Sequence, residues 1–100
     1  MSVGPLFLDR DSCRVYKSGQ EISLTGREFL LLSYLMENAD KIISKERLYE
    51  QVWGEYSSIC DNTIMVHIRH IREKIEDDPS NPKQLITVKG LGYKLKNRMD

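Results

Sequence analysis

The segment from Asp61 to Ile75 constrains the fold of this chain more than any other stretch, because its isoleucines recur with the period of a helix. They are separated by four, three and four positions and would form one narrow apolar seam: Ile64, Ile68, Ile71 and Ile75. Asp61 or Asn62 is a suitable N-cap, and the prolines that follow prevent the helix from running beyond about Asp77. The sequence therefore predicts an amphipathic helix over residues 62–76.

The opposite side of this helix carries a mixture of basic and apolar side chains: Met65, Val66, Arg69, His70, Arg72 and Glu73. In a DNA major groove, arginine can donate to the edge of guanine, and an aliphatic side chain such as Val66 can touch a thymine methyl group. A solvated helix face with one stray valine would give the same pattern, since isolated apolar residues are common on surfaces. The helix alone leaves both interpretations open.

Charge along the chain favours the nucleic-acid interpretation, although the net charge is zero. Residues 1–61 hold seven Lys and Arg against ten Asp and Glu, whereas residues 62–100 hold eight against five. The basic excess lies mainly near the end of the chain: Lys83, Lys89, Lys94, Lys96 and Arg98. Phosphate binding requires a local basic surface of this kind, and a neutral total can conceal it.

Length and composition predict one domain, residues 1–100, with its own hydrophobic core. No apolar run is long enough to cross a membrane, and two cysteines far apart in sequence give no disulfide framework. We interpret Cys13 and Cys60 as small packing residues in a reduced, cytoplasmic protein. We expect no metal ion and no cofactor.

The first half of the chain predicts a small antiparallel sheet followed by two helices. Three short runs have the pattern of strands: 6–8, 13–17 and 20–24. Thr25 and Glu28 form a capping box for a helix over 26–38, which is apolar in nearly every direction except that of Ser33. The second helix, 45–53, lies between two end signals, Ser44 as its N-cap and Gly54 as its C-terminal stop.

The chain closes with a predicted β-hairpin over residues 85–96, with a glycine-bearing turn. Alternation along each strand predicts one apolar face of Ile86, Val88, Tyr93 and Leu95. The other face would then hold Thr87, Lys89, Lys94 and Lys96. A solvated lysine face is one explanation. A hairpin with a basic face directly after a basic helix is also the arrangement of a winged helix, in which both elements meet one duplex.

In this order and at these spacings, the chain resembles the C-terminal effector domain of OmpR/PhoB-type response regulators over essentially its whole length. The matching blocks are Leu24–Leu32, Ser44–Leu48, Val52–Gly54, Asn62–Lys74 and Thr87–Lys94. The resemblance implies an α+β fold: a winged helix-turn-helix with a four-stranded N-terminal antiparallel β-sheet, a three-helix core and a C-terminal hairpin wing. It also implies sequence-specific binding to double-stranded DNA, with helix 62–76 in the major groove and wing 85–96 at the minor groove.

The resemblance assigns DNA contacts to individual positions. Those that touch bases or phosphates correspond to Val66, Arg69, His70 and Arg72. Those near the backbone and the groove edges correspond to Thr63, His67, Trp53, Thr87, Lys89 and Tyr93. Lys94 joins the wing contacts; like Lys89 and His70, it stands where arginine is frequent in the family. We expect Val66, His70 and Arg72 to face bases, and Arg69 and the wing lysines to face phosphates.

The same resemblance implies partners. The loop 54–61 corresponds to the segment that can meet RNA polymerase, and two domains are expected on direct-repeat promoter sites. The sequence lacks the receiver domain through which a sensor histidine kinase would act, so the chain is either an excised effector domain or a receiver-less relative, and we expect the first. We expect the domain to be monomeric in isolation and dimeric on DNA.

Three other functions remain to be weighed. A metal or redox site could be built from Cys60, His67 and His70, although no fourth ligand is evident. A helix-turn-helix protein-interaction module without a DNA role would have the same fold. An enzyme is disfavoured, because the sequence holds no phosphate-binding glycine loop and no nucleophile with a matching base.

Overall fold

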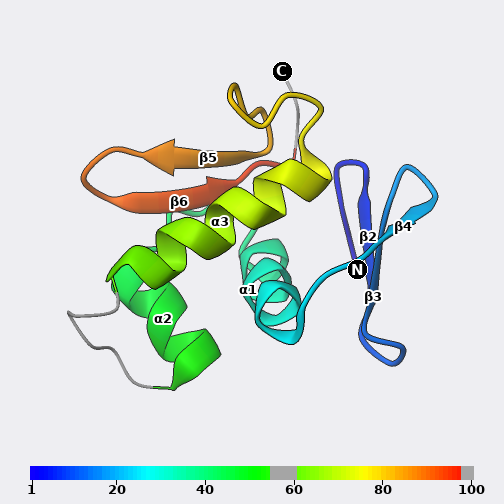
Figure 1. Ribbon diagram of the computed structural model, residues 1–100, viewed down its shortest axis with the longest axis horizontal. Helices are drawn as coiled ribbons and strands as arrows, with labels where there is room; N and C mark the ends of the chain where they lie inside the picture. The colour runs from blue at the N-terminus through cyan, green and yellow to red at the C-terminus, as the bar shows by residue number, and fades with distance from the viewer. Residues whose placement is uncertain (55–60, 98–100) are drawn as a thin grey trace.

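The computed structural model describes residues 1–54 and 61–97, and Figure 1 shows how their helices and strands follow one another. An N-terminal antiparallel sheet is followed by three helices and then by a two-stranded hairpin. Its elements are β1 (Ser2–Val3), β2 (Leu6–Asp9), β3 (Arg14–Lys17), β4 (Gln20–Ile22), α1 (Gly26–Glu37), α2 (Lys45–Trp53), α3 (Asp61–Ile75), β5 (Leu85–Val88) and β6 (Gly92–Leu95). This confirms the predicted winged helix-turn-helix architecture. A membrane-spanning segment would have to be longer and more apolar than any helix among the described residues.

The N-terminal sheet has strand order β1-β2-β3-β4 and covers one side of the core. Leu8 pairs with Val15, and both side chains are 1% exposed on its inner face. On the outer face Phe7 pairs with Tyr16, and their rings lie 6.2 Å apart. The alternation of buried and exposed residues follows the period of two that strand geometry imposes.

Cys13 lies outside this sheet, contrary to the predicted strand over 13–17. The carboxylate of Asp9 accepts the amide of Asp11 at 3.0 Å, a side-chain turn that bends the chain before β3 begins at Arg14. Cys13 has a φ of 56° and is exposed. Its interpretation as a packing residue is therefore wrong, and Cys60 lies outside the described residues.

Helix α1 begins as predicted and is the central strut of the core. The hydroxyl of Thr25 accepts the amide of Glu28, and the carboxylate of Glu28 accepts the amide of Thr25, which completes the capping box. The buried side differs from the prediction in two places. Leu30 is 47% exposed, whereas Ser33 is only 7% exposed and donates its hydroxyl to the carbonyl of Leu30. A helical serine can be buried in this way because its hydroxyl is satisfied within its own helix.

Helices α2 and α3 form the helix-turn-helix. Ser44 caps α2 by accepting the amide of Arg47, and Gly54 ends it with a left-handed φ of 90°, both as predicted. The isoleucine seam of α3 is buried as predicted, with none of its four members more than 2% exposed. Helix α3 begins at Asp61, so Asn62 is a helical residue and not a cap. The helix ends at Ile75, short of the expected Asp77.

The hairpin β5–β6, called the wing from here on, forms over the predicted residues with different faces. Its register pairs Leu85 with Leu95, Ile86 with Lys94, Thr87 with Tyr93 and Val88 with Gly92. Directly paired residues share a face. The predicted apolar face of Ile86, Val88, Tyr93 and Leu95 is therefore wrong. One face holds Leu85, Thr87, Tyr93 and Leu95, and the other holds Ile86, Val88 and Lys94.

The segment between α1 and α2 pairs with the free side of β6. The backbones of Ile43 and Tyr93 exchange two hydrogen bonds, of 2.8 and 2.9 Å. Gly92 is required here, because a Cβ at this position would lie 2.1 Å from the carbonyl oxygen of Ile43, at a φ of 144°. The wing is thereby fixed against the start of α2.

Candidate nucleic-acid interface

The exposed side of α3 and the wing border one groove of about 500 Å³. It is lined by Asn62, Met65, Val66, Ile68, Arg69, Arg72, Thr87 and Tyr93. Five of the sequence-predicted contacts come together here: Val66, Arg69, Arg72, Thr87 and Tyr93. Figure 1 shows α3 lying alongside the wing, so residues far apart in the sequence face one surface.

The apolar part of this surface faces outward because the isoleucine seam holds the opposite side of α3 in the core. Met65 is 60% exposed and Val66 is 39% exposed. Arg69 is exposed on the same side. Met65 belongs to the outer face that the sequence predicts, but it is not among the predicted contacts. Its exposure next to Val66 indicates a surface that can contact apolar groups as well as anions.

Arg72 is more constrained than the sequence suggested. Its Nε donates to the carbonyl of Leu85, and its Nη2 donates to the hydroxyl of Thr87, both at 2.8 Å. Burial lowers the pKa of the guanidinium, although arginine remains charged at neutral pH. Arg72 therefore does not project freely from α3, since two of its nitrogens bind the wing.

His70 also has a partner within the protein, although its side chain is 42% exposed. Its Nδ1 lies 3.5 Å from a carboxylate oxygen of Glu28, which is a buried residue of α1. Lys74, one turn further along α3, donates to the other oxygen of that carboxylate at 2.6 Å. Burial raises the pKa of Glu28, but the hydrogen bonds from Lys74 and Thr25 outweigh it, and the pKa is lowered overall. His70 thus lies toward α1, at the edge of the exposed face.

Three predicted contacts gather where α3 meets α2. The Trp53 ring stacks on Tyr49 with centroids 5.0 Å apart and meets the edge of His67 at 5.1 Å. Nδ1 of His67 lies 2.8 Å from the carbonyl oxygen of Thr63. Arg27 of α1 lies over Trp53 at 5.4 Å and donates to the carbonyl of Val52. Sequence reasoning missed Arg27, because no local pattern relates it to the end of α2.

The sequence family described as "Transcriptional regulatory protein, C terminal" matches residues 19–95. The chain belongs to this family. Sensory transduction protein RegX3 of Mycolicibacterium smegmatis is 41% identical over 95 residues, which make up 95% of this chain and 42% of the relative. The chain thus spans less than half the length of this curated relative.

Solved structures agree on the family and the fold. The Klebsiella pneumoniae RstA DNA-binding domain, solved in complex with the RstA box, has a TM-score of 0.90 at 26% identity and covers 98% of this chain and 97% of its own. The Thermotoga maritima response regulator DrrB, an OmpR/PhoB homologue, has a TM-score of 0.85 at 34% identity over 96% of this chain and 43% of its own. The predicted resemblance to OmpR/PhoB-type effector domains is confirmed. These are transcription-regulator domains, which are not an enzyme class.

In this OmpR/PhoB-type domain the two wing lysines lie in different places. Lys89 is exposed in the turn between β5 and β6. Lys94 pairs with Ile86, on the face of the wing opposite to Thr87 and Tyr93. A single flat basic face of the wing, as the sequence suggested, is therefore not formed.

The rival metal site gains no support from the geometry of its two histidines. His67 faces Trp53, whereas His70 faces the carboxylate of Glu28. Among residues 1–54 and 61–97 no group of three His, Cys, Asp or Glu is arranged to hold an ion. Cys60 lies outside those residues.

Proposed function

We propose that this domain binds double-stranded DNA sequence-specifically, as the output domain of a two-component transcriptional response regulator. The observation that carries the proposal is the groove in which exposed Val66 and Arg69 of α3 meet Thr87 and Tyr93 of the wing. A helix with an arginine and aliphatic face suits the major groove. A hairpin beside it suits the adjacent minor groove and its phosphates.

The contacts divide by chemistry. Val66 and His70 are proposed to meet base edges, and Arg69, Lys89 and Lys94 to meet phosphates. The two hydrogen bonds to the wing use two of the five N–H groups of Arg72, so its proposed contact with a base edge is made through the others. The remaining proposed contacts, at the backbone and groove edges, are Trp53, Thr63, His67, Thr87 and Tyr93.

For the whole protein, we propose that two such domains bind direct-repeat promoter sites in the cytoplasm. We also propose that loop 54–61, of which residues 55–60 lie outside the described residues, meets RNA polymerase. Control by a sensor histidine kinase would require a receiver domain. The match with RegX3 covers 42% of that relative, so the unmatched part of RegX3 is long enough to hold a further domain.

The test begins with selection of bound duplexes from a random pool, which yields a preferred site. Affinity for that site and for random duplex is then measured across salt concentrations. Binding should weaken with a log–log slope of about −0.9 per phosphate neutralised. A protein-interaction module would yield no enriched sequence and little binding at any salt.

Three variants and a matched control then test the division of contacts. Val66→Ala and His70→Ala should change the preferred sequence, whereas Lys89→Ala should weaken specific and random binding equally. Arg14→Ala removes the same charge from β3, away from α3 and the wing, and should leave binding nearly unchanged. Equal loss of specific and random binding in all three variants would refute the division.

A further inference from the structure

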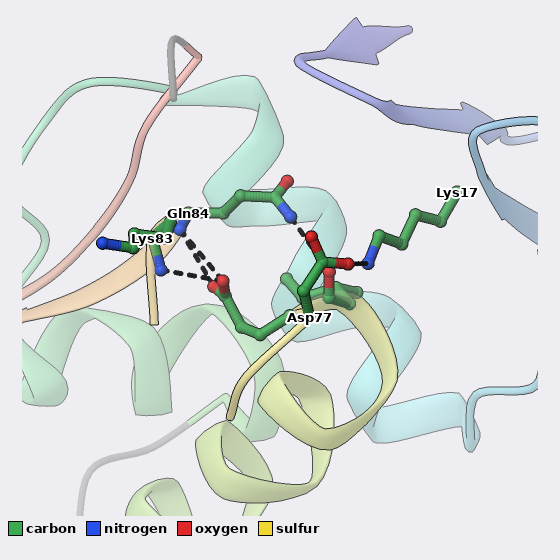
Figure 2. Close-up of polar contacts among 6 residues, drawn as sticks. Lys17, Asp77, Lys83 and Gln84 are labelled. Carbon is green, nitrogen blue, oxygen red and sulfur yellow. Dashed lines mark hydrogen bonds and ion pairs between the residues drawn. The ribbon is translucent and has the colours of Figure 1, made fainter. Parts of the chain in front are cut away.

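Glu76 is a buried carboxylate with no place in the proposed DNA contacts. It follows α3 directly and is only 6% exposed. Three consecutive amides donate to it, those of Lys83 at 2.8 Å, Gln84 at 3.0 Å and Leu85 at 2.7 Å. In Figure 2, dashed lines mark the hydrogen bonds from the amides of Lys83 and Gln84, and these lines converge on one carboxylate. A buried carboxylate is stable only with donors of this kind around it.

Arg72 lies one helical turn before Glu76 and binds the same short segment. Its Nε donates to the carbonyl of Leu85, and the amide of Leu85 donates to the carboxylate of Glu76. The amide of Lys96 donates to the carbonyl of Gln84, so the backbone groups of Leu85 point away from β6. The side chains of Arg72, in α3, and of Glu76, directly after it, thus bind both outward groups of Leu85, as the backbone of a neighbouring strand would.

A second set of contacts holds the chain between α3 and the wing. The side-chain amide of Gln84, which is fully buried, donates to the carbonyl of Ile75 at 3.0 Å. Figure 2 shows Lys17 and Asp77 pointing toward one another, and Lys17 Nζ lies 2.8 Å from the Asp77 carboxylate. The hydrogen bond from Lys17 lowers the pKa of Asp77. The connection is therefore anchored to the last turn of α3 and to β3.

We propose that Arg72 and Glu76 are positioning residues that latch the wing to α3, so that both reach DNA in one fixed relative placement. The inference rests on the proposed DNA binding. A wing hinged loosely at residues 76–84 would have to be ordered on binding, and that ordering lowers affinity. A latched wing is ordered beforehand, and its spacing from α3 then contributes to the choice of site.

The test is Glu76→Gln, with Glu73→Gln as the matched control. Both changes remove one negative charge from the end of α3, and Glu73 is exposed. Charge alone would strengthen binding to phosphate in both variants. Loss of the latch acts in the opposite direction, and Glu76→Gln should bind the selected site about tenfold more weakly than Glu73→Gln. Equal affinity of the two folded variants overturns the proposal.

Hydrogen exchange separates this result from the DNA proposal. In Glu76→Gln the amides of Gln84 and Leu85 should lose protection, while that of Ile71 keeps it. If the unaltered domain binds no duplex, the DNA proposal fails, and the exchange rates alone decide whether the latch exists. If Glu76→Gln does not fold, the exchange rates of the unaltered domain decide whether the latch exists. Amides of Gln84 and Leu85 that exchange as fast as that of Lys89 overturn the latch, and exchange as slow as that of Ile71 supports it.

Discussion

Replacing Glu28 by glutamine would remove the charge that connects the start of α1 to the last turns of α3. The Glu28 side chain is 4% exposed, and Lys74 Nζ lies 2.6 Å from its Oε1. Glutamine keeps the shape and retains an oxygen for the amide of Thr25, so the change acts mainly on the interaction with Lys74. We therefore expect a loss of stability without a change of fold.

The magnitude follows from the exposure of the two partners. Hydrogen bonds to charged groups contribute about 1.5–3 kcal/mol. Lys74 is 34% exposed, so in the variant its ammonium regains part of its hydration. The loss of stability should therefore lie near the lower end of this range. We expect Glu28→Gln to lower the free energy of unfolding by about 2 kcal/mol, or the Tm by about 8–16 °C for a domain of this size.

The loss should depend on pH. The folded-state pKa of Glu28 lies below its ordinary value of 4.5. A carboxyl group with a lowered pKa stabilises the fold above its unfolded-state value, and this contribution disappears as the pH falls through its folded-state value. The difference between the unaltered domain and Glu28→Gln should thus be complete at pH 7 and shrink below pH 4.5.

Urea and thermal unfolding, followed by circular dichroism, measure both effects. Glu37→Gln is the control, because it makes the same change at an exposed position of α1. It removes only the exposed ion pair with Arg10 and should alter stability by less than about 1 kcal/mol. A double-mutant cycle with Lys74→Met should give a coupling energy of about 1–2 kcal/mol. A coupling near zero, or a difference that stays constant into acid, would refute the reasoning.

Three further outcomes are expected. Gly92→Ala should destabilise the domain by more than about 2 kcal/mol in urea unfolding, since the added Cβ would collide with the backbone of Ile43. The control, Gly90→Ala, should cost about 1 kcal/mol, because Gly90 has a φ of 78° but a Cβ there would have no atom within 4 Å. Equal losses of stability in the two variants would contradict the collision. Thr25→Ala should cost about 1 kcal/mol and reduce the protection of the first α1 amides in hydrogen exchange. Cys13 should react with iodoacetamide in the folded protein at the rate of the urea-unfolded chain, as peptide mass spectrometry would show, and strong protection would contradict its exposed position.

Features set by residues within one helical turn could be predicted from the sequence. The isoleucine seam of α3, the capping box of α1 and the glycine stop at Gly54 all depend on local spacing, and all three are confirmed. The burial of Ser33 in place of Leu30 could not be predicted, because it depends on which elements pack around α1.

The wing shows a different limit. Alternation along one strand predicts which of its residues share a face. It does not predict which residues of the partner strand lie on that same face. That match depends on the register, which the pairing of Val88 with Gly92 sets at the turn. A shift of one residue moves Tyr93 from the side of Ile86 to that of Thr87.

The partners of His70 and Arg72 lay beyond any local pattern. Helical spacing placed both residues on the outer face of α3, but their hydrogen-bonding and ionic partners belong to α1 and β5. A long side chain at the edge of an exposed helix face can turn back onto neighbouring elements. Sequence spacing fixes the direction of the Cα–Cβ bond and not the position of the terminal nitrogens.

The backbone contacts of Leu85 and Tyr93 also bear on aggregation. A two-stranded hairpin has two open edges, and unpaired N–H and C=O groups on an edge can recruit a strand from another molecule. Here Arg72 and Glu76 occupy the edge of β5 at Leu85, and Ile43 occupies the edge of β6 at Tyr93. Strand addition by a neighbouring molecule is thereby blocked at both positions, while the side chains of α3 and the turn of the wing stay accessible.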